Sequence, residues 1–187
     1  MQGQLQKASI LPSAPFKSVH CYGQQRRIHV RIVLTYTYRV LDAPGLRDDF
    51  YCSIMAYDAN SNTLAVGLGY LLYSWDEATG VVLLHGDSRD GSWLTSLAFS
   101  SDAGEKSILA FGRSNGVLML MSMYDGLLSR METKLSAPVA CTSWRPTPVP
   151  RKSLNPFGSG ATVLTEDLIV GDEIGDIYYY SVEWPDN

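Results

Sequence analysis

The stretch that decides the fold is "TLAVGLGYLLYSWD", residues 63–76. It holds a short apolar run with Gly67, a glycine turn and a second apolar run that ends in Trp75-Asp76. The same order recurs in "ILAFGRSNGVLMLM" (108–121) and "LIVGDEIGDIYYYS" (168–181), with Gly112 and Gly171 in the place of Gly67. A glycine that recurs within a strand pattern indicates a close approach between strands, where a side chain would obstruct packing.

Each of these segments follows an earlier strand pattern that ends in an aromatic residue. The three earlier runs are "SIMAY" (53–57), "SLAF" (96–99) and "CTSW" (141–144). A period of about 40–45 residues with four short strands and a Trp-Asp pair is typical of WD-repeat blades. The sequence therefore predicts an all-β chain, a WD-repeat β-propeller fragment of about three four-stranded blades. We expect the blades at about residues 50–86, 91–132 and 137–184.

The third blade is interrupted by "RPTPVPRKSLNPFGSGATVLTE", residues 145–166, which contains four prolines. Because proline cannot donate to a sheet ladder, we predict a long loop here, between the first two strands of that blade, and favour disorder over a functional role. We also expect its fourth strand to be weak or absent. Propellers close with four to eight blades, so we expect the partial propeller, residues 39–187, not to close and favour the interpretation that the sequence is partial or truncated.

Charge divides the chain. Residues 1–41 contain six basic side chains and no acidic one, whereas the rest contains nine basic and all 19 acidic residues. We interpret residues 1–38 as a basic, mostly disordered tail with a possible strand at 28–38. The acidic body argues against nucleic acid as a partner and favours cationic ligands.

The three cysteines, Cys21, Cys52 and Cys141, form no C-x-x-C pair, which is typical of a reducing compartment. We interpret Cys52 and Cys141 as core thiols. No signal peptide or membrane span is apparent, and the expected location is the nucleus and cytoplasm.

Signals for an enzyme are weak. The spacing of His20, His29 and His85 fits no metal site, and we interpret His85 as a loop histidine. "GLG" (67–69) and "GSG" (158–160) lack the context of a nucleotide loop and of a nucleophile elbow. We therefore predict no catalytic residue, no metal, no cofactor and no small-molecule substrate.

One segment stands outside the repeats, "YRVLDAPGLRDDFYCS", residues 38–53. If Asp48 and Asp49 open a strand, their side chains point to opposite faces and do not form a catalytic dyad. Carboxylates beside aromatic rings suit a cationic, extended peptide. Equally, Asp48 would solvate the edge of a blade while Phe50 packs beneath it, and the residues alone leave both interpretations open.

The motif "RVLDAPGLRDDFY" (39–51), followed by "LAVGLGYLLYSWD" (64–76), resembles the start of the propeller in the Fizzy and Fizzy-related activators of the anaphase-promoting complex. The resemblance extends over roughly residues 39–184, and "DDFYCS" is similar to the fungal meiotic branch. It implies a non-enzymatic adaptor that presents substrates to a ubiquitin ligase in mitosis or meiosis. The implied partners are subunits of that complex and substrates with destruction-box or KEN-box degrons.

The resemblance also implies a degron-binding site. Asp42 would bind the arginine of a destruction box, and Asp49 and Phe50 would lie by the KEN-box site. Residues 1–38 contain no element like the family's C-box, and the chain ends in Asp186-Asn187 where the family has Ile-Arg. A generic WD-repeat scaffold and a non-functional truncated fragment are the alternatives.

Overall fold

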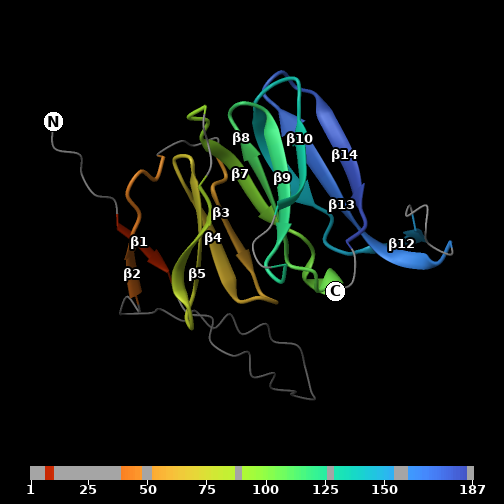
Figure 1. The fold of residues 1–187 in the computed structure, drawn as a ribbon, viewed down its shortest axis with the longest axis horizontal. Coiled ribbons are helices and arrows are strands. Elements are labelled where there is room, and N and C mark those ends of the chain that lie inside the picture. Colours follow the sequence, from red (N-terminus) through yellow and green to blue (C-terminus); the bar gives the residue numbers. More distant parts are fainter. Residues whose placement is uncertain are drawn as a thin grey trace, which may run out of the picture. The chain divides into compact units, whose positions relative to one another are not determined.

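The computed structural model describes residues 7–10, 39–47, 52–86, 90–125, 129–153 and 160–184. Over these residues the secondary structure is β-strand, apart from one 3-10 turn at Asp102–Gly104 (Figure 1). The chain divides into two compact units, Met1–Pro44 and Gly45–Asn187. The smaller unit holds one strand pair and the larger unit holds three sheets.

The smaller unit pairs β1 (Lys7–Ile10) with β2 (Arg39–Asp42) in an antiparallel ladder. β1 lies inside the region predicted to be a disordered tail, so that prediction is wrong over these four residues. The backbone groups of β1 find partners in β2, and such a long-range pairing leaves no local signal in the sequence. The possible strand at 28–38 lies outside the described residues.

Blade one is a meander of β3 (Met55–Asp58), β4 (Thr63–Leu68), β5 (Leu71–Asp76) and β6 (Gly80–His85), each paired with the next. Asp76 of the Trp-Asp pair closes the β5–β6 turn. Its Oδ1 accepts hydrogen bonds from the backbone N–H groups of Ala78 and Thr79, both at 2.8 Å. The two-residue β4–β5 turn begins at Gly69, whose φ of +63° favours glycine.

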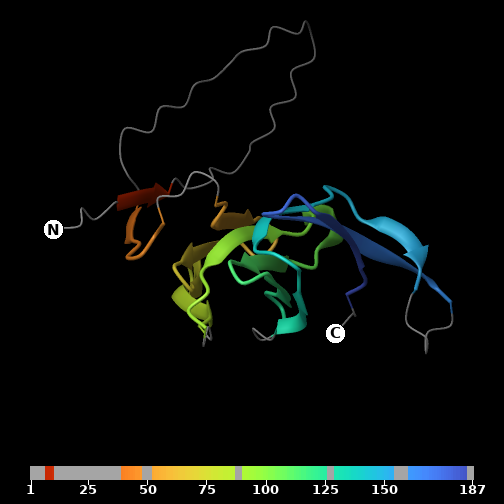
Figure 2. The ribbon, with the colours of Figure 1, turned by 90° about the horizontal axis from the view of Figure 1, so that it is seen from above.

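Blade two repeats the meander with β7 (Leu94–Phe99), β8 (Ile108–Arg113), β9 (Val117–Ser122) and β10 (Ser129–Lys134). It is the middle sheet of the larger unit, because β7 contacts both β3 of blade one and the first strand of blade three. Figures 1 and 2 show the three sheets following one another in chain order.

Blade three contains β11 (Val139–Trp144), β12 (Val149–Lys152), β13 (Thr162–Asp172) and β14 (Ile177–Val182). β11 and β12 pair in succession with the second and first halves of the long strand β13, and β14 pairs with β13 as well. Both β12 and the start of β13 lie within residues 145–166, so the structure contradicts a loop over this whole range. Pro150 is tolerated because β12 pairs on one side only, and an edge strand leaves some N–H groups unpaired.

The recurring glycines lie where successive blades touch. A Cβ on Gly67 of β4 would lie 3.1 Å from Leu94 Cδ1 of blade two. A Cβ on Gly112 of β8 would lie only 2.3 Å from Val139 Cγ1 of blade three. These contacts confirm that the repeat needs glycine because a neighbouring strand packs against it.

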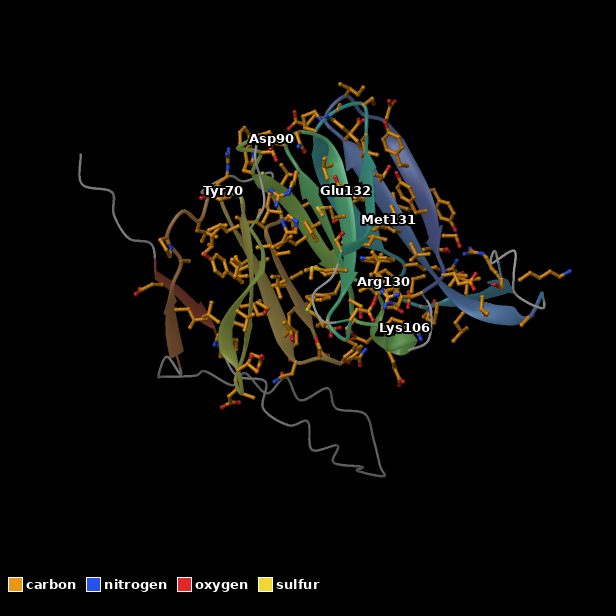
Figure 3. The ribbon with its side chains drawn as sticks, viewed as in Figure 1. Tyr70, Asp90, Lys106, Arg130, Met131 and Glu132 are labelled. Atoms are coloured by element: carbon orange, nitrogen blue, oxygen red, sulfur yellow. The ribbon has the colours of Figure 1, made fainter. Side chains whose placement is uncertain are left out.

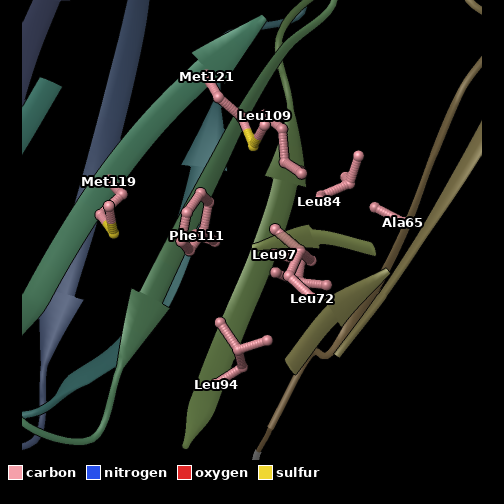
Figure 4. Packing of buried hydrophobic residues seen from close by; sticks show 9 residues of the cluster. All are labelled: Ala65, Leu72, Leu84, Leu94, Leu97, Leu109, Phe111, Met119 and Met121. Carbon is pink, nitrogen blue, oxygen red and sulfur yellow. The ribbon is translucent and has the colours of Figure 1, made fainter. Parts of the chain in front are cut away.

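Two apolar clusters hold the blades together. The first joins blades one and two (Figure 4), and its buried members are Ala65, Leu72, Leu84, Leu94, Leu97, Leu109, Phe111, Met119 and Met121. The second joins blades two and three through Ile108, Ala110, Leu118, Leu120, Leu135, Val139, Leu168 and Val170. The predicted fold class, an unclosed set of about three four-stranded blades, is confirmed.

Cys141 was expected in a core and is exposed, whereas Cys52 is partly buried. Strand β11 turns alternate side chains to opposite faces of blade three, and Cys141 is on the face away from blade two. The apolar character of the surrounding sequence therefore gave the wrong side for this thiol.

Candidate functional site

The structure describes one of the three residues proposed for degron binding. Asp42 is the last residue of β2, lies opposite Lys7 in the ladder and is exposed. Asp49 and Phe50 lie outside the described residues. The grouping of Asp42 with Asp49 and Phe50 in one site therefore stays a prediction.

Arg47, just before the two aspartates, is anchored to blade two. Its Cζ lies 4.5 Å from the centroid of the Trp93 ring, the geometry of a cation–π contact. Trp93 precedes β7 and keeps 40% of its surface exposed. The chain that leads into Asp48 and Asp49 thus starts from a fixed point on an aromatic ring.

Trp93 belongs to a rim of loops at one end of the blades, which we call the loop rim and define by Tyr70, Asp90, Trp93, Ser114 and Asn115. The backbone N–H of Trp93 donates to Ser114 Oγ at 3.1 Å, and Ser114 N–H donates to the Trp93 carbonyl at 2.9 Å. Asn115 Nδ2 donates to Asp90 Oδ2 at 2.6 Å. These bonds tie the loop before β7 to the β8–β9 turn, and Figure 3 shows Tyr70 and Asp90 at this end of the sheets.

A buried arginine supports the loop rim from below. Arg113, at the end of β8, donates from Nη2 to the Tyr70 carbonyl at 3.2 Å and from Nη1 to the Ser92 carbonyl at 2.9 Å. Its Nη2 also lies 2.9 Å from His85 Nδ1. Because a guanidinium only donates, His85 Nδ1 must accept, which leaves the ring proton of a neutral imidazole on Nε2.

His85 was interpreted as a loop histidine and is instead the last residue of β6. Its ring also lies against Phe111, with centroids 5.5 Å apart. These contacts place His85 in the junction between blades one and two and give it a structural role.

The chemistry of the loop rim suits a peptide more than a small reactant. Tyr70 and Trp93 expose aromatic surface, and Asp90 adds a carboxylate. Among the described residues, no group of His, Cys, Asp and Glu side chains gathers as a metal site would require. Sequence reasoning missed Trp93 and Arg113, because each lies at the margin of its repeat where no periodic pattern marks it.

In the described parts of the chain, there is no helix with the length and apolar character that a bilayer crossing demands. No family model matches the sequence.

Individual proteins do match. The chain is 33% identical over 144 residues to the meiotic fizzy-related protein 2 of Schizosaccharomyces pombe, a match that covers 76% of this chain and 24% of the relative. It is 38% identical over 117 residues to the APC/C activator protein CDH1 of Saccharomyces cerevisiae, covering 61% of this chain and 19% of the relative. The chain thus spans about a quarter of these relatives or less.

Among solved structures, the chain resembles one in the crystal structure of the mitotic checkpoint complex with a TM-score of 0.60 and 23% identity. The match covers 90% of this chain and 45% of that one. This likeness shows the propeller fold. The sequence matches show that the chain is similar to activators of the Fizzy type, including a meiotic one, as its motif at residues 39–51 predicts.

Proposed function

We propose that this chain contributes to a substrate-recognition adaptor of the anaphase-promoting complex and carries out no catalysis itself. The observation that carries the proposal is its similarity to relatives named as activators of that complex, in a chain whose blades have their fold. The proposed partners are subunits of the ligase and degron-bearing substrates, without nucleic acid, membrane or small-molecule substrate. Such a role places the protein in the nucleus and cytoplasm.

The proposed ligands are destruction-box and KEN-box peptides, and the proposed contacts are Asp42, Asp49 and Phe50. Support comes from charge and from the neighbouring residues. Destruction boxes contain arginine and KEN boxes contain lysine, and a carboxylate beside aromatic surface favours both cations. Arg47 precedes Asp49 by two residues and rests on Trp93 of the loop rim, which exposes such surface.

Fluorescence polarisation with labelled degron peptides tests the proposal. We expect Asp42→Ala to weaken binding of the destruction-box peptide and Asp49→Ala to weaken binding of the KEN-box peptide. Glu132→Ala is the matched control, because it removes an exposed carboxylate from β10 of blade two. Equal affinity of all three variants and the wild type for both peptides would contradict the assignment.

Affinity capture from dividing cells separates this role from that of a generic WD-repeat scaffold. Recovery of ligase subunits together with degron-bearing proteins supports the adaptor. Stable complexes that contain neither would support the scaffold instead.

A further inference from the structure

The outer face of blade three repeats the faces that are buried between the other blades. In each blade, the residue paired with the shared glycine lies on the next strand: Leu72 opposite Gly67, Leu118 opposite Gly112 and Ile177 opposite Gly171. Leu72 and Leu118 are fully buried by the following blade, whereas Ile177 is 76% exposed. The position is apolar in all three blades, but only in blade three does it face solvent.

The next position on this face shows the same contrast. Ala65, Ala110 and Ile169 each precede the shared glycine by two residues. The two alanines are fully buried, while Ile169 is 49% exposed and its cross-strand neighbour Tyr179 is 58% exposed. We call Ile169, Gly171, Ile177 and Tyr179 the following face of blade three, because the matching residues of the earlier blades pack on the blade that follows.

Blade one presents the opposite kind of face. Met55, Leu97 and Thr142 each pair with the residue just before the shared glycine of their own blade. Leu97 is buried in the cluster that joins blades one and two, and Thr142 N–H donates to Ser96 Oγ of blade two at 2.9 Å. Met55 is 54% exposed.

Tyr57, Phe99 and Trp144 form a second such set, since each pairs with the residue three places before its glycine. Trp144 Nε1 donates to the Ala98 carbonyl of blade two at 3.0 Å, whereas Tyr57 is 52% exposed. Met55 and Tyr57 form what we call the leading face of blade one, because their counterparts pack on the blade that precedes.

One unit therefore carries both halves of a blade junction, at its two ends. Three blades are too few to close on themselves, because closed propellers contain four to eight. Two copies of this unit supply six blades, which lies within that range, whereas three copies supply nine. A head-to-tail contact that closes after two copies leaves no apolar face in water.

We propose that two copies of this chain assemble into a six-bladed ring, in which the following face of each blade three packs on the leading face of the other copy's blade one. The apolar part of this contact repeats the two junctions already present within the chain. The inference is independent of the proposed degron binding, since it uses none of the same residues.

The lower margin of the following face is polar, and its charges are already paired. Asp167 is buried beside Arg151, whose Nη2 donates to Asp167 Oδ2 at 2.9 Å and to the Tyr179 hydroxyl at 3.0 Å. Arg151 Nη1 also donates to Ser181 Oγ at 2.7 Å. Paired groups of this kind suit the polar rim that surrounds an apolar contact.

Molar mass measured by light scattering or sedimentation, across a dilution series of the full chain, provides the first test. We expect the mass of a dimer for the wild type and a shift to monomer for Ile177→Asp, with unchanged circular dichroism. Ile174→Asp is the matched control, because Ile174 is equally exposed but lies in the β13–β14 turn, and it should stay dimeric. A monomeric wild type, or assemblies that grow beyond two copies, would overturn the proposal.

A cysteine pair tests the geometry directly. Cys141 is the counterpart of Ser96, since each pairs with its blade's shared glycine, and Ser96 Oγ lies 2.8 Å from Thr142 Oγ1 of the next blade. The counterpart of Thr142 in blade one is Met55. We therefore expect Met55→Cys to form a disulfide with Cys141 of the other copy, seen as a dimer on a non-reducing gel and as a linked peptide by mass spectrometry.

Tyr124→Cys serves as the control for this crosslink, because Tyr124 is similarly exposed but lies after β9 in the middle blade. It should give no peptide linked to Cys141. Failure of Met55→Cys to link to Cys141 in a dimeric protein would overturn the proposed pairing of faces.

Discussion

Substitution of Gly112 by alanine tests whether a single glycine permits blades two and three to pack. A Cβ at this position would lie 2.3 Å from Val139 Cγ1 and 2.6 Å from Val139 Cβ. Val139 is fully buried, so it has no solvent-filled space into which to move. Overpacking of this kind costs about 1–3 kcal/mol, whereas removing a glycine from a strand recovers roughly 0.5–1 kcal/mol.

The expected net loss is therefore about 1–2 kcal/mol in the free energy of unfolding. Urea unfolding followed by tryptophan fluorescence, at one fixed protein concentration, measures it. Gly67→Ala is the matched control, because its Cβ would meet the flexible end of Leu94 at 3.1 Å, and it should cost less. The double variant Gly112→Ala/Val139→Ala should lose less stability than the sum of the single variants, because the smaller residue makes room.

Two results would refute this reasoning about the glycine. One is a Gly112→Ala variant that unfolds at the same urea concentration as the wild type. The other is a larger loss for Gly67→Ala than for Gly112→Ala. Either would mean that the blades adjust their spacing freely and that the repeat does not require glycine for packing.

Three further substitutions test single contacts. Burial raises the pKa of Glu166, which accepts from Ser101 Oγ, so the stability linked to this shift is present at acidic pH and is lost as pH rises through the folded-state pKa; in urea titrations, Glu166→Gln should gain on the wild type as pH rises. Arg113→Met should cost at least about 1–3 kcal/mol in the same assay, because it strands carbonyls that the guanidinium now satisfies. Trp93→Ala should speed tryptic cleavage after Arg47, since it removes the ring on which that side chain rests, whereas Trp93→Phe should largely preserve protection.

The repeat was predictable from sequence because blade packing depends on local rules. A glycine that admits the next strand and an aromatic residue that ends the innermost strand recur at fixed places, and the structure puts both at blade junctions. The strand β12 was not predictable from the same rules. The prolines suggested a loop, yet an edge strand makes fewer demands on N–H groups than a central one.

The surroundings of the candidate site were predictable only in part. The motif at residues 39–51 drew attention to Asp42, Asp49 and Phe50 through resemblance alone. Nothing in the sequence marks Trp93 as the partner of Arg47, because the two residues are distant in the chain and a cation–π contact has no spacing signature. The loop rim therefore emerges only from the fold.

The two proposals can fail separately, because they depend on different residues and different measurements. Ile177→Asp alters the following face of blade three, so it should change the molar mass of the assembly while leaving the carboxylates of Asp42 and Asp49 intact. Asp42→Ala should weaken degron binding without changing that mass. If Ile177→Asp abolished peptide binding as well, the degron site would need residues from both copies. Peptide affinity that persists in the monomeric variant would place the whole site within a single chain.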